Sequence, residues 1–245
     1  MTLWRLEWLR LVRTQRIAIL AAVYGAFGLL GPLVVRFLPD ILESVGEDAA
    51  GFPVMTPPDA ITQYVGNVQQ IGLLVVAFVA AAALAIDANF EIAVFFRSRT
   101  SVTELVKSRF VATAIAVIAA FVLGSVVAYV ATGILLEWLD LWPMVVGVVL
   151  HAVYLMFAIA VIALVASLLR KTVAVALVSV GALLVLGIVS LASPLAPWLP
   201  SDLLGALDQL IRGGPFDYWR AIASALVLCG GLLLLAVRRF ETREV

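Results

Sequence analysis

The sequence is poor in charge, cysteine and histidine. Charged residues make up 13% of its 245 residues, against roughly 25% in a typical soluble domain. Its single cysteine, Cys229, excludes an intramolecular disulfide and any metal site built on several cysteines. Its single histidine, His151, lies in an apolar run that carries no carboxylate. We therefore expect His151 to hydrogen-bond to a neighbouring helix and not to relay protons.

Several functional motifs are missing as well. No Gly-X-X-X-X-Gly-Lys-Ser/Thr occurs, which excludes ATP binding by a P-loop. Gly124-Ser125 lacks the flanking residues of an intramembrane serine protease, and neither paired intramembrane aspartates nor a His-Glu metal motif is found. A soluble domain with a basic face, which nucleic-acid binding would need, is also lacking. We expect no catalytic residue, no metal site, no cofactor in this chain and no nucleic-acid partner.

Apolar residues are what the sequence has in abundance. They make up 64% of the chain and form long uncharged runs between short polar breaks. Each run matches the roughly 17–25 residues that a helix needs to cross a bilayer, whereas the alternation of barrel strands is not found. The prediction is an all-α integral membrane protein with one domain over residues 1–245. Its six spans are expected at 17–37, 62–86, 110–134, 142–168, 172–191 and 220–237.

The uncharged runs, of which the first ends at Val35 and the last begins at Ala221, carry no Asp, Glu, Lys or Arg. Secondary transporters and proton pumps place such residues within their spans as coupling or relay sites. The uncharged runs therefore argue against both classes, and they favour an apolar or amphipathic cargo if the protein is a transporter.

The few basic residues are distributed unevenly between the breaks. Thirteen of the 16 Lys and Arg fall in the N-terminal segment, the even-numbered breaks and the C-terminal tail. The exceptions are Arg36, Arg212 and Arg220. Cytoplasmic loops hold Lys and Arg in excess, so both termini are predicted to lie in the cytoplasm.

Residues 1–16 are predicted to form an interfacial helix on the cytoplasmic side. One face of this helix carries Trp4, Trp8, Leu11 and Val12. The remainder carries Arg5, Arg10, Arg13 and Arg16. Basic side chains opposite Trp and Leu suit a helix that lies in the headgroup region.

Two segments are predicted on the outer side. The loop over residues 192–219 contains a leucine pattern that predicts a short helix over Ser201–Gly214, resting on or dipping into the outer leaflet. The loop over about residues 38–60 is acidic, and its carboxylates are interpreted as surface solvation because they lack calcium-loop spacing.

Polar residues gather in the outer half of the second span. The candidates for substrate contact are Gln63, Asn67 and Gln70, which share a face at helical spacing. Amides at membrane depth are found facing the interior of a helix bundle. They either line a substrate path or hold helices together, and the sequence favours neither role.

The cytoplasmic link over residues 87–109 is long, mixed in charge and periodic. Phe90 and Val94 belong to an apolar stripe, Arg97 and Arg99 flank a break, and a new helix is expected from Ser101 or Thr103. Such a helix-break-helix suits a docking surface. The alternative is that it anchors the ends of two spans by snorkelling.

Glu91, Ser98-Arg99 and Glu104-Leu105-Val106-Lys107 occupy this link in an order that resembles the type-2 ABC transporter permease family. Thr100 stands where that family often has Pro, and no Gly follows Glu91. The resemblance implies six spans, a basic N-terminal helix and a link that docks on a separate ATPase dimer. The residues it assigns to ATPase coupling are Phe90, Glu91, Val94, Arg97, Arg99, Glu104 and Lys107.

The resemblance also implies an assembly and a reaction. The chain would be the permease subunit of an ATP-driven exporter in the cell membrane of a prokaryote, paired with a second, identical or similar permease. ATP and Mg would be bound by the ATPase, so this chain would not itself be an enzyme. The cargo would be a drug, a lipid or a hydrophobic peptide. The alternative is a non-transporting assembly or sensor subunit that partners an ABC ATPase.

Overall fold

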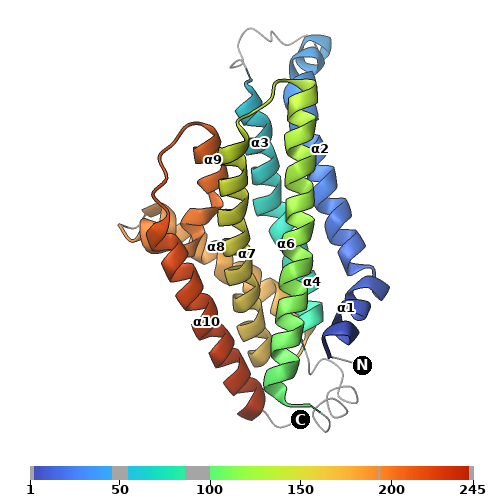
Figure 1. Ribbon diagram of the computed structural model, residues 1–245, viewed down its shortest axis with the longest axis vertical. Coiled ribbons are helices and arrows are strands. Elements are labelled where there is room, and N and C mark those ends of the chain that lie inside the picture. The colour runs from blue at the N-terminus through green and yellow to red at the C-terminus, as the bar shows by residue number, and fades with distance from the viewer. Residues whose placement is uncertain (1–2, 46–54, 86–99, 193, 243–245) are drawn as a thin grey trace.

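The structure, a computed structural model, describes residues 3–45, 55–85, 100–192 and 194–242. All regular structure within these ranges is helical (Figure 1). The longer elements are α1 (Leu3–Arg13), α2 (Arg16–Val45), α3 (Pro57–Asn67), the π-helical turn η2 (Val68–Gly72), α4 (Leu73–Leu84), α6 (Val102–Leu135), α7 (Leu141–Leu168), α8 (Thr172–Ala192) and α10 (Trp219–Thr242). Six helical stretches in the described part of the chain are long and apolar enough to cross a membrane: α2, α3 through α4, α6, α7, α8 and α10. This confirms the predicted all-α membrane fold with six spans.

Two spanning helices extend beyond the apolar runs that predict them. α2 continues to Val45, past the predicted end of the span at residue 37 and into the expected acidic loop. α6 starts at Val102, where the Ser101 hydroxyl caps it by accepting a hydrogen bond from the Glu104 N–H at 3.2 Å. Hydropathy locates the part of a helix that lies in lipid, whereas caps and solvated side chains decide where the helix ends.

α2 packs closely against two neighbours because it presents glycines to them. A Cβ atom added to Gly28 would lie 2.5 Å from the carbonyl oxygen of Gly124 on α6. One added to Gly31 would lie 2.5 Å from the carbonyl oxygen of Ala60 on α3. Small residues let membrane helices approach to backbone contact, so these positions set the spacing of α2, α3 and α6.

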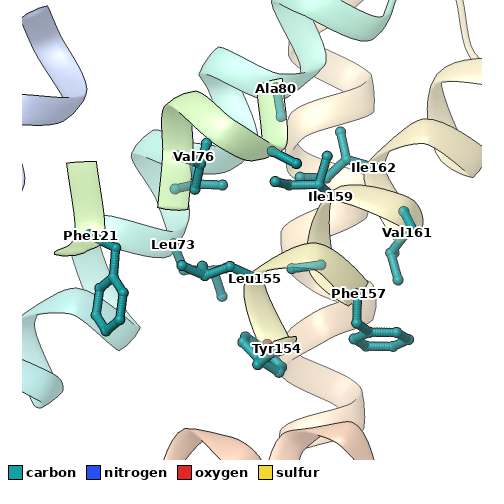
Figure 2. Close-up of a cluster of buried hydrophobic side chains, with 14 of the residues drawn as sticks. Leu73, Val76, Ala80, Phe121, Tyr154, Leu155, Phe157, Ile159, Val161 and Ile162 are labelled. Atoms are coloured by element: carbon teal, nitrogen blue, oxygen red, sulfur yellow. The ribbon is translucent and has the colours of Figure 1, made fainter. Parts of the chain in front are cut away.

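Side chains fill the interior of the bundle around α7, which is the most enclosed of the six spanning stretches. Figure 2 shows α4 and α7 facing each other across this core, with Phe121 contributed by α6. The facing residues of α4 and α7 include Leu73, Val76, Ala80, Leu155, Ile159 and Ile162. Side chains of one chain fill the interior here, so this packing does not favour a wide substrate path through a single bundle.

The two ends of the bundle differ in what they gather. At one end, which we call the α1 end, α1 lies on one side of the start of α6 and the end of α10 lies on its other side (Figure 1). There the Thr103 hydroxyl donates to the Glu241 carboxylate at 2.8 Å. The elements nearest the two termini therefore lie at the same end, as six crossings require. That this end is cytoplasmic stays a prediction.

The opposite end, the α9 end, is built from the segment between α8 and α10. This segment contains the 3-10 turns η4 (Ala196–Trp198) and η5 (Pro200–Leu204) and the short helix α9 (Ala206–Ile211). A short helix is found within the expected stretch Ser201–Gly214, but only over Ala206–Ile211, because Gly205 separates α9 from the 3-10 turn η5. Leu207 of α9 is fully buried. Gly147 on α7 leaves room for Leu207, since a Cβ atom added to Gly147 would lie 2.5 Å from the Cδ1 of Leu207.

Candidate functional site

The three candidate path residues lie on the outside of the single chain. Gln63 and Gln70 are exposed and Asn67 is half-buried. No hydrogen bond joins their side-chain amides to any of the residues that the structure describes. By contrast, Gln69 points the other way, and its Nε2 donates to the Leu204 carbonyl at 2.8 Å. The sequence-based expectation that these amides face the interior of their own bundle is therefore not met by the three candidates.

These amides follow one another along the first half of the spanning stretch, with Gln63 nearest its start and Gln70 deepest. Gln70 lies halfway along the 28-residue stretch Pro57–Leu84. At about 1.5 Å per residue it is roughly 20 Å along this helix from Pro57. An amide exposed to hydrocarbon at such a depth loses its hydrogen bonds to water, which costs several kcal/mol unless a partner replaces them (roughly 2–7 for an uncompensated group).

A local irregularity accompanies the amides. The π-helical turn η2 interrupts the α-helical stretch at Val68–Gly72, directly after Asn67, and contains Gln70. π turns are rare and occur frequently at functional sites. Beyond the turn the exposed surface becomes apolar, with Ile71, Leu74 and Phe78 all exposed. The outward face of this span thus carries unpartnered amides above an apolar strip.

A buried ion pair stands at the α1 end. The Arg109 Nε donates to the Glu7 carboxylate at 3.0 Å, and its Nη1 donates to the Ala83 carbonyl at 3.3 Å. Both charged side chains are almost fully enclosed. This pair ties α1 to α6 and to the last turn of α4.

Sequence reasoning missed this pair because Glu7 and Arg109 are 102 residues apart and no local pattern joins them. The helix of residues 1–16 is confirmed over Leu3–Arg13, but its buried face is formed by Glu7 and Leu11. Trp4 and Trp8 stack on each other beside that face, with ring centroids 6.3 Å apart. A single acid among arginines, one turn before a leucine, was the signal available in the sequence.

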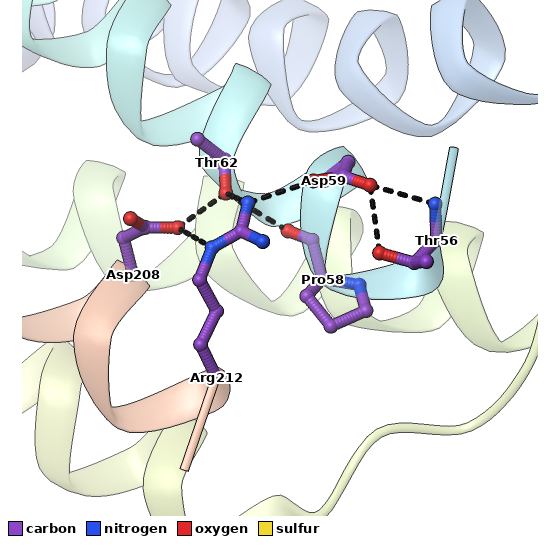
Figure 3. A network of polar contacts seen from close by, with 6 residues as sticks. All are labelled: Thr56, Pro58, Asp59, Thr62, Asp208 and Arg212. Atoms are coloured by element: carbon purple, nitrogen blue, oxygen red, sulfur yellow. Dashed lines mark hydrogen bonds and ion pairs between the residues drawn. The ribbon is translucent and has the colours of Figure 1, made fainter. Parts of the chain in front are cut away.

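A second polar network joins α3 to α9 at the α9 end (Figure 3). Arg212 donates from Nη2 to Asp59 Oδ1 at 2.7 Å and from Nε to Asp208 Oδ1 at 2.9 Å. Its Nη2 also lies 2.8 Å from the Thr62 hydroxyl, which donates to Asp208. The hydrogen bonds that Arg212 donates to Asp59 and then to Asp208 raise the pKa of Arg212, so the guanidinium stays charged. We call this network the α9 clasp.

The clasp corrects the interpretation of Asp59 as surface solvation. Its carboxylate also accepts hydrogen bonds from the backbone N–H and the hydroxyl of Thr56, each at 2.7 Å. Asp59 therefore caps the start of α3 and holds α9 at the same time.

The proposed ATPase-coupling residues fall mostly outside the described part of the chain. Glu104 and Lys107 are exposed on the first turns of α6. The remaining candidates, which lie outside the described residues, are Phe90, Glu91, Val94, Arg97 and Arg99. Their role stays a prediction.

His151 is placed differently from the sequence expectation. It is buried and stacks on Phe121 with ring centroids 4.4 Å apart. Its Nδ1 has no hydrogen-bond partner among the described residues. The ring therefore contributes by packing, and the expected hydrogen bond from this nitrogen is not found. Among the described residues no three His, Cys, Asp or Glu side chains are grouped to hold a metal ion.

Comparison with known proteins adds no assignment. No protein-family model matches the sequence, and no curated protein matches it significantly.

Proposed function

We propose that this membrane protein is the permease subunit of an ATP-driven exporter that works with a second permease chain and a separate ATPase. The observation that carries the proposal is the outward face of α3 and η2. Gln63, Asn67 and Gln70 lie there along the first half of a spanning stretch, and their side-chain amides have no hydrogen-bond partner among the described residues. Lipid cannot hydrogen-bond these amides, so a second chain or a wet path must face them.

The filled interior supports the same arrangement. Because the core around α7 is packed with side chains, a path is favoured between two chains and not within one. Two such chains meeting near this face would enclose amides from both, with the apolar strip of Ile71, Leu74 and Phe78 continuing the surface. A surface of amides and apolar side chains suits an apolar or amphipathic cargo such as a drug, a lipid or a hydrophobic peptide.

The energy source is proposed from the link to α6. This sequence has no P-loop of its own, and the resemblance of Glu91, Ser98-Arg99 and the Glu104–Lys107 stretch to type-2 ABC permeases supports a docked ATPase. The exposure of Glu104 and Lys107 is compatible with docking. ATP binding by the partner would move the link and rock the spans that flank it.

One observation favours a rival function. The packed core leaves no evident wide path in the described part of one chain, as would also be true of a non-transporting assembly or sensor subunit. Such a subunit would use the ATPase mechanically and would still bury the amide face against a partner.

The deciding experiment is transport by the complete assembly. The chain is reconstituted in vesicles with the ABC ATPase encoded beside it, and ATP-dependent movement of labelled amphipathic compounds is measured. We expect ATP-dependent uptake of such compounds into inside-out vesicles. An Asn67→Leu variant should change which compounds are taken up, while the ATPase remains bound. An Ile71→Leu variant on the same face is the matched control. Normal ATPase binding with no flux of any compound would favour the sensor, and no ATPase binding at all would reject the exporter.

A further inference from the structure

Three arginines gather around one carboxylate at the α1 end. Glu7 accepts from Arg109 at 3.0 Å and lies 3.6 Å from the Nη1 of Arg10. Arg16, the first residue of α2, is within electrostatic reach of all three of these side chains. Among the residues that the structure describes, Glu7 is the carboxylate that faces this group. Counted over the described residues alone, this group carries more positive than negative charge in a partly enclosed position.

The guanidinium group of Arg16 has a buried nitrogen, Nη1, with no acceptor beside it in the described chain. Arg109 differs, because it reaches both Glu7 and the Ala83 carbonyl. A buried donor without a partner is unfavourable, and more so when it is charged. An anion beside Arg16 would remove that cost and reduce the repulsion between Arg16 and Arg10.

The surroundings indicate which anion fits. α1 turns into α2 at Gln15, whose φ of 56° lies in the left-handed region, so α1 runs across the end of the bundle (Figure 1). Exposed apolar side chains adjoin these arginines at helical spacing: Leu6 lies one turn before Arg10 on α1, and Ile19 lies one turn after Arg16 on α2. A ligand at this corner would meet guanidinium groups and an apolar surface together, at the level where α2 begins to span. A phospholipid has that combination of a charged phosphate and acyl chains.

We propose that Arg10 and Arg16 bind the headgroup phosphate of an anionic phospholipid, whose acyl chains meet the exposed apolar side chains of Leu6 and Ile19. Glu7 serves this site indirectly, because its pairing with Arg109 removes the only acid of α1 from the surface and fixes the helix in place. The site would keep α1 in the headgroup region whatever the protein transports. The proposal therefore does not depend on the proposed function.

The test measures lipid binding to the purified full-length chain. Native mass spectrometry compares phosphatidylglycerol with phosphatidylcholine of the same acyl chains, and a third arm adds millimolar inorganic phosphate. We expect phosphatidylglycerol to be retained in preference to phosphatidylcholine and not to be displaced by inorganic phosphate. Arg16→Gln should weaken this retention about fivefold and Arg10→Gln/Arg16→Gln by about twentyfold or more, since each basic residue contributes roughly 1 kcal/mol to anionic lipid binding.

Two controls keep the result interpretable. Arg16→Lys retains the charge and should keep most of the binding. Arg36→Gln/Arg220→Gln removes two exposed arginines, each beside an aromatic ring, from outside this cluster, and should leave binding unchanged. Arg16→Gln is expected to fold normally because the Nη1 that it removes has no partner in the described chain. Equal retention of both lipids, or undiminished binding by Arg16→Gln, would overturn the proposal. Displacement by inorganic phosphate without lipid preference would show a free-anion site in its place.

Discussion

The two charged side chains that are most fully enclosed in the described part of the chain neutralise each other. Arg109 is 2% exposed and Glu7 is 5% exposed, and the two are held together at 3.0 Å. Removing both charges from water is costly, and their attraction repays the cost only while both are present. Deleting one partner should therefore lower the stability of the protein strongly, and deleting the second partner as well should restore part of the loss.

Glu7→Gln is expected to lower thermal stability strongly, because it leaves the Arg109 guanidinium buried without its carboxylate. Removing one partner of a buried pair costs roughly 3–5 kcal/mol. The midpoint of thermal unfolding in detergent checks this, with Glu104→Gln as control because Glu104 is exposed on the first turn of α6. Glu7→Gln/Arg109→Gln should be more stable than Glu7→Gln alone. An unchanged midpoint for Glu7→Gln would mean that the pair does not hold α1.

At the scale of elements, the sequence predicts features that depend on neighbouring residues, but not contacts between residues far apart in the chain. The spans follow from local hydropathy, and the start of α6 follows from Ser101, whose capping partner Glu104 is three residues away. The partners of Arg212 lie farther off, since 153 residues separate it from Asp59. No local pattern links these two residues. The sequence alone therefore predicts Arg212 only as a basic residue on the outer side and Asp59 only as a solvated acid.

The direction of the face that carries the three amides could not be predicted from the sequence either. Spacing placed Gln63, Asn67 and Gln70 on one face correctly enough to single them out, but it could not tell which way that face points. The direction depends on packing against other helices, where Gln69 meets Leu204 and Tyr64 bonds to the Phe121 carbonyl at 3.2 Å. The π turn η2 adds to this, because nothing local in Val68–Gly72 distinguishes it from an α-helix.

The α9 clasp should decide how firmly α9 is held against α3. Arg212→Gln removes the guanidinium that bridges Asp59 and Asp208, so hydrogen exchange of backbone amides in Ala206–Ile211 is expected to become faster. Overall unfolding should shift little, because the Arg212 side chain is 42% exposed and exposed ion pairs contribute only about 0–1 kcal/mol. Arg220→Gln is the matched control, since Arg220 contacts the Trp198 ring instead. Identical exchange in Arg212→Gln and the unmodified protein would show that leucine packing alone holds α9.

At the scale of the whole molecule, the spans are unequally enclosed. α7 is largely surrounded by other helices, whereas α2, α8 and α10 present most of their side chains outward. Exposed apolar side chains on those three helices suit lipid, and exposed amides on α3 and η2 do not. The surface of the bundle therefore has one polar place at membrane depth among the described residues, which is where a partner chain is proposed.

The orientation of this bundle is the last prediction. If the excess of Lys and Arg marks the cytoplasmic side, the α1 end faces the cytoplasm and the α9 end faces outward. Single cysteines are introduced at Glu137 and Thr242, both exposed, in a Cys229→Ala background that removes the one native thiol. A membrane-impermeant maleimide added to intact cells should label Glu137→Cys and leave Thr242→Cys unlabelled until the membrane is opened. Labelling of Thr242→Cys in intact cells would invert the orientation. It would also place the arginine cluster of α1 at the outer leaflet, where the proposed ATPase could not reach α6.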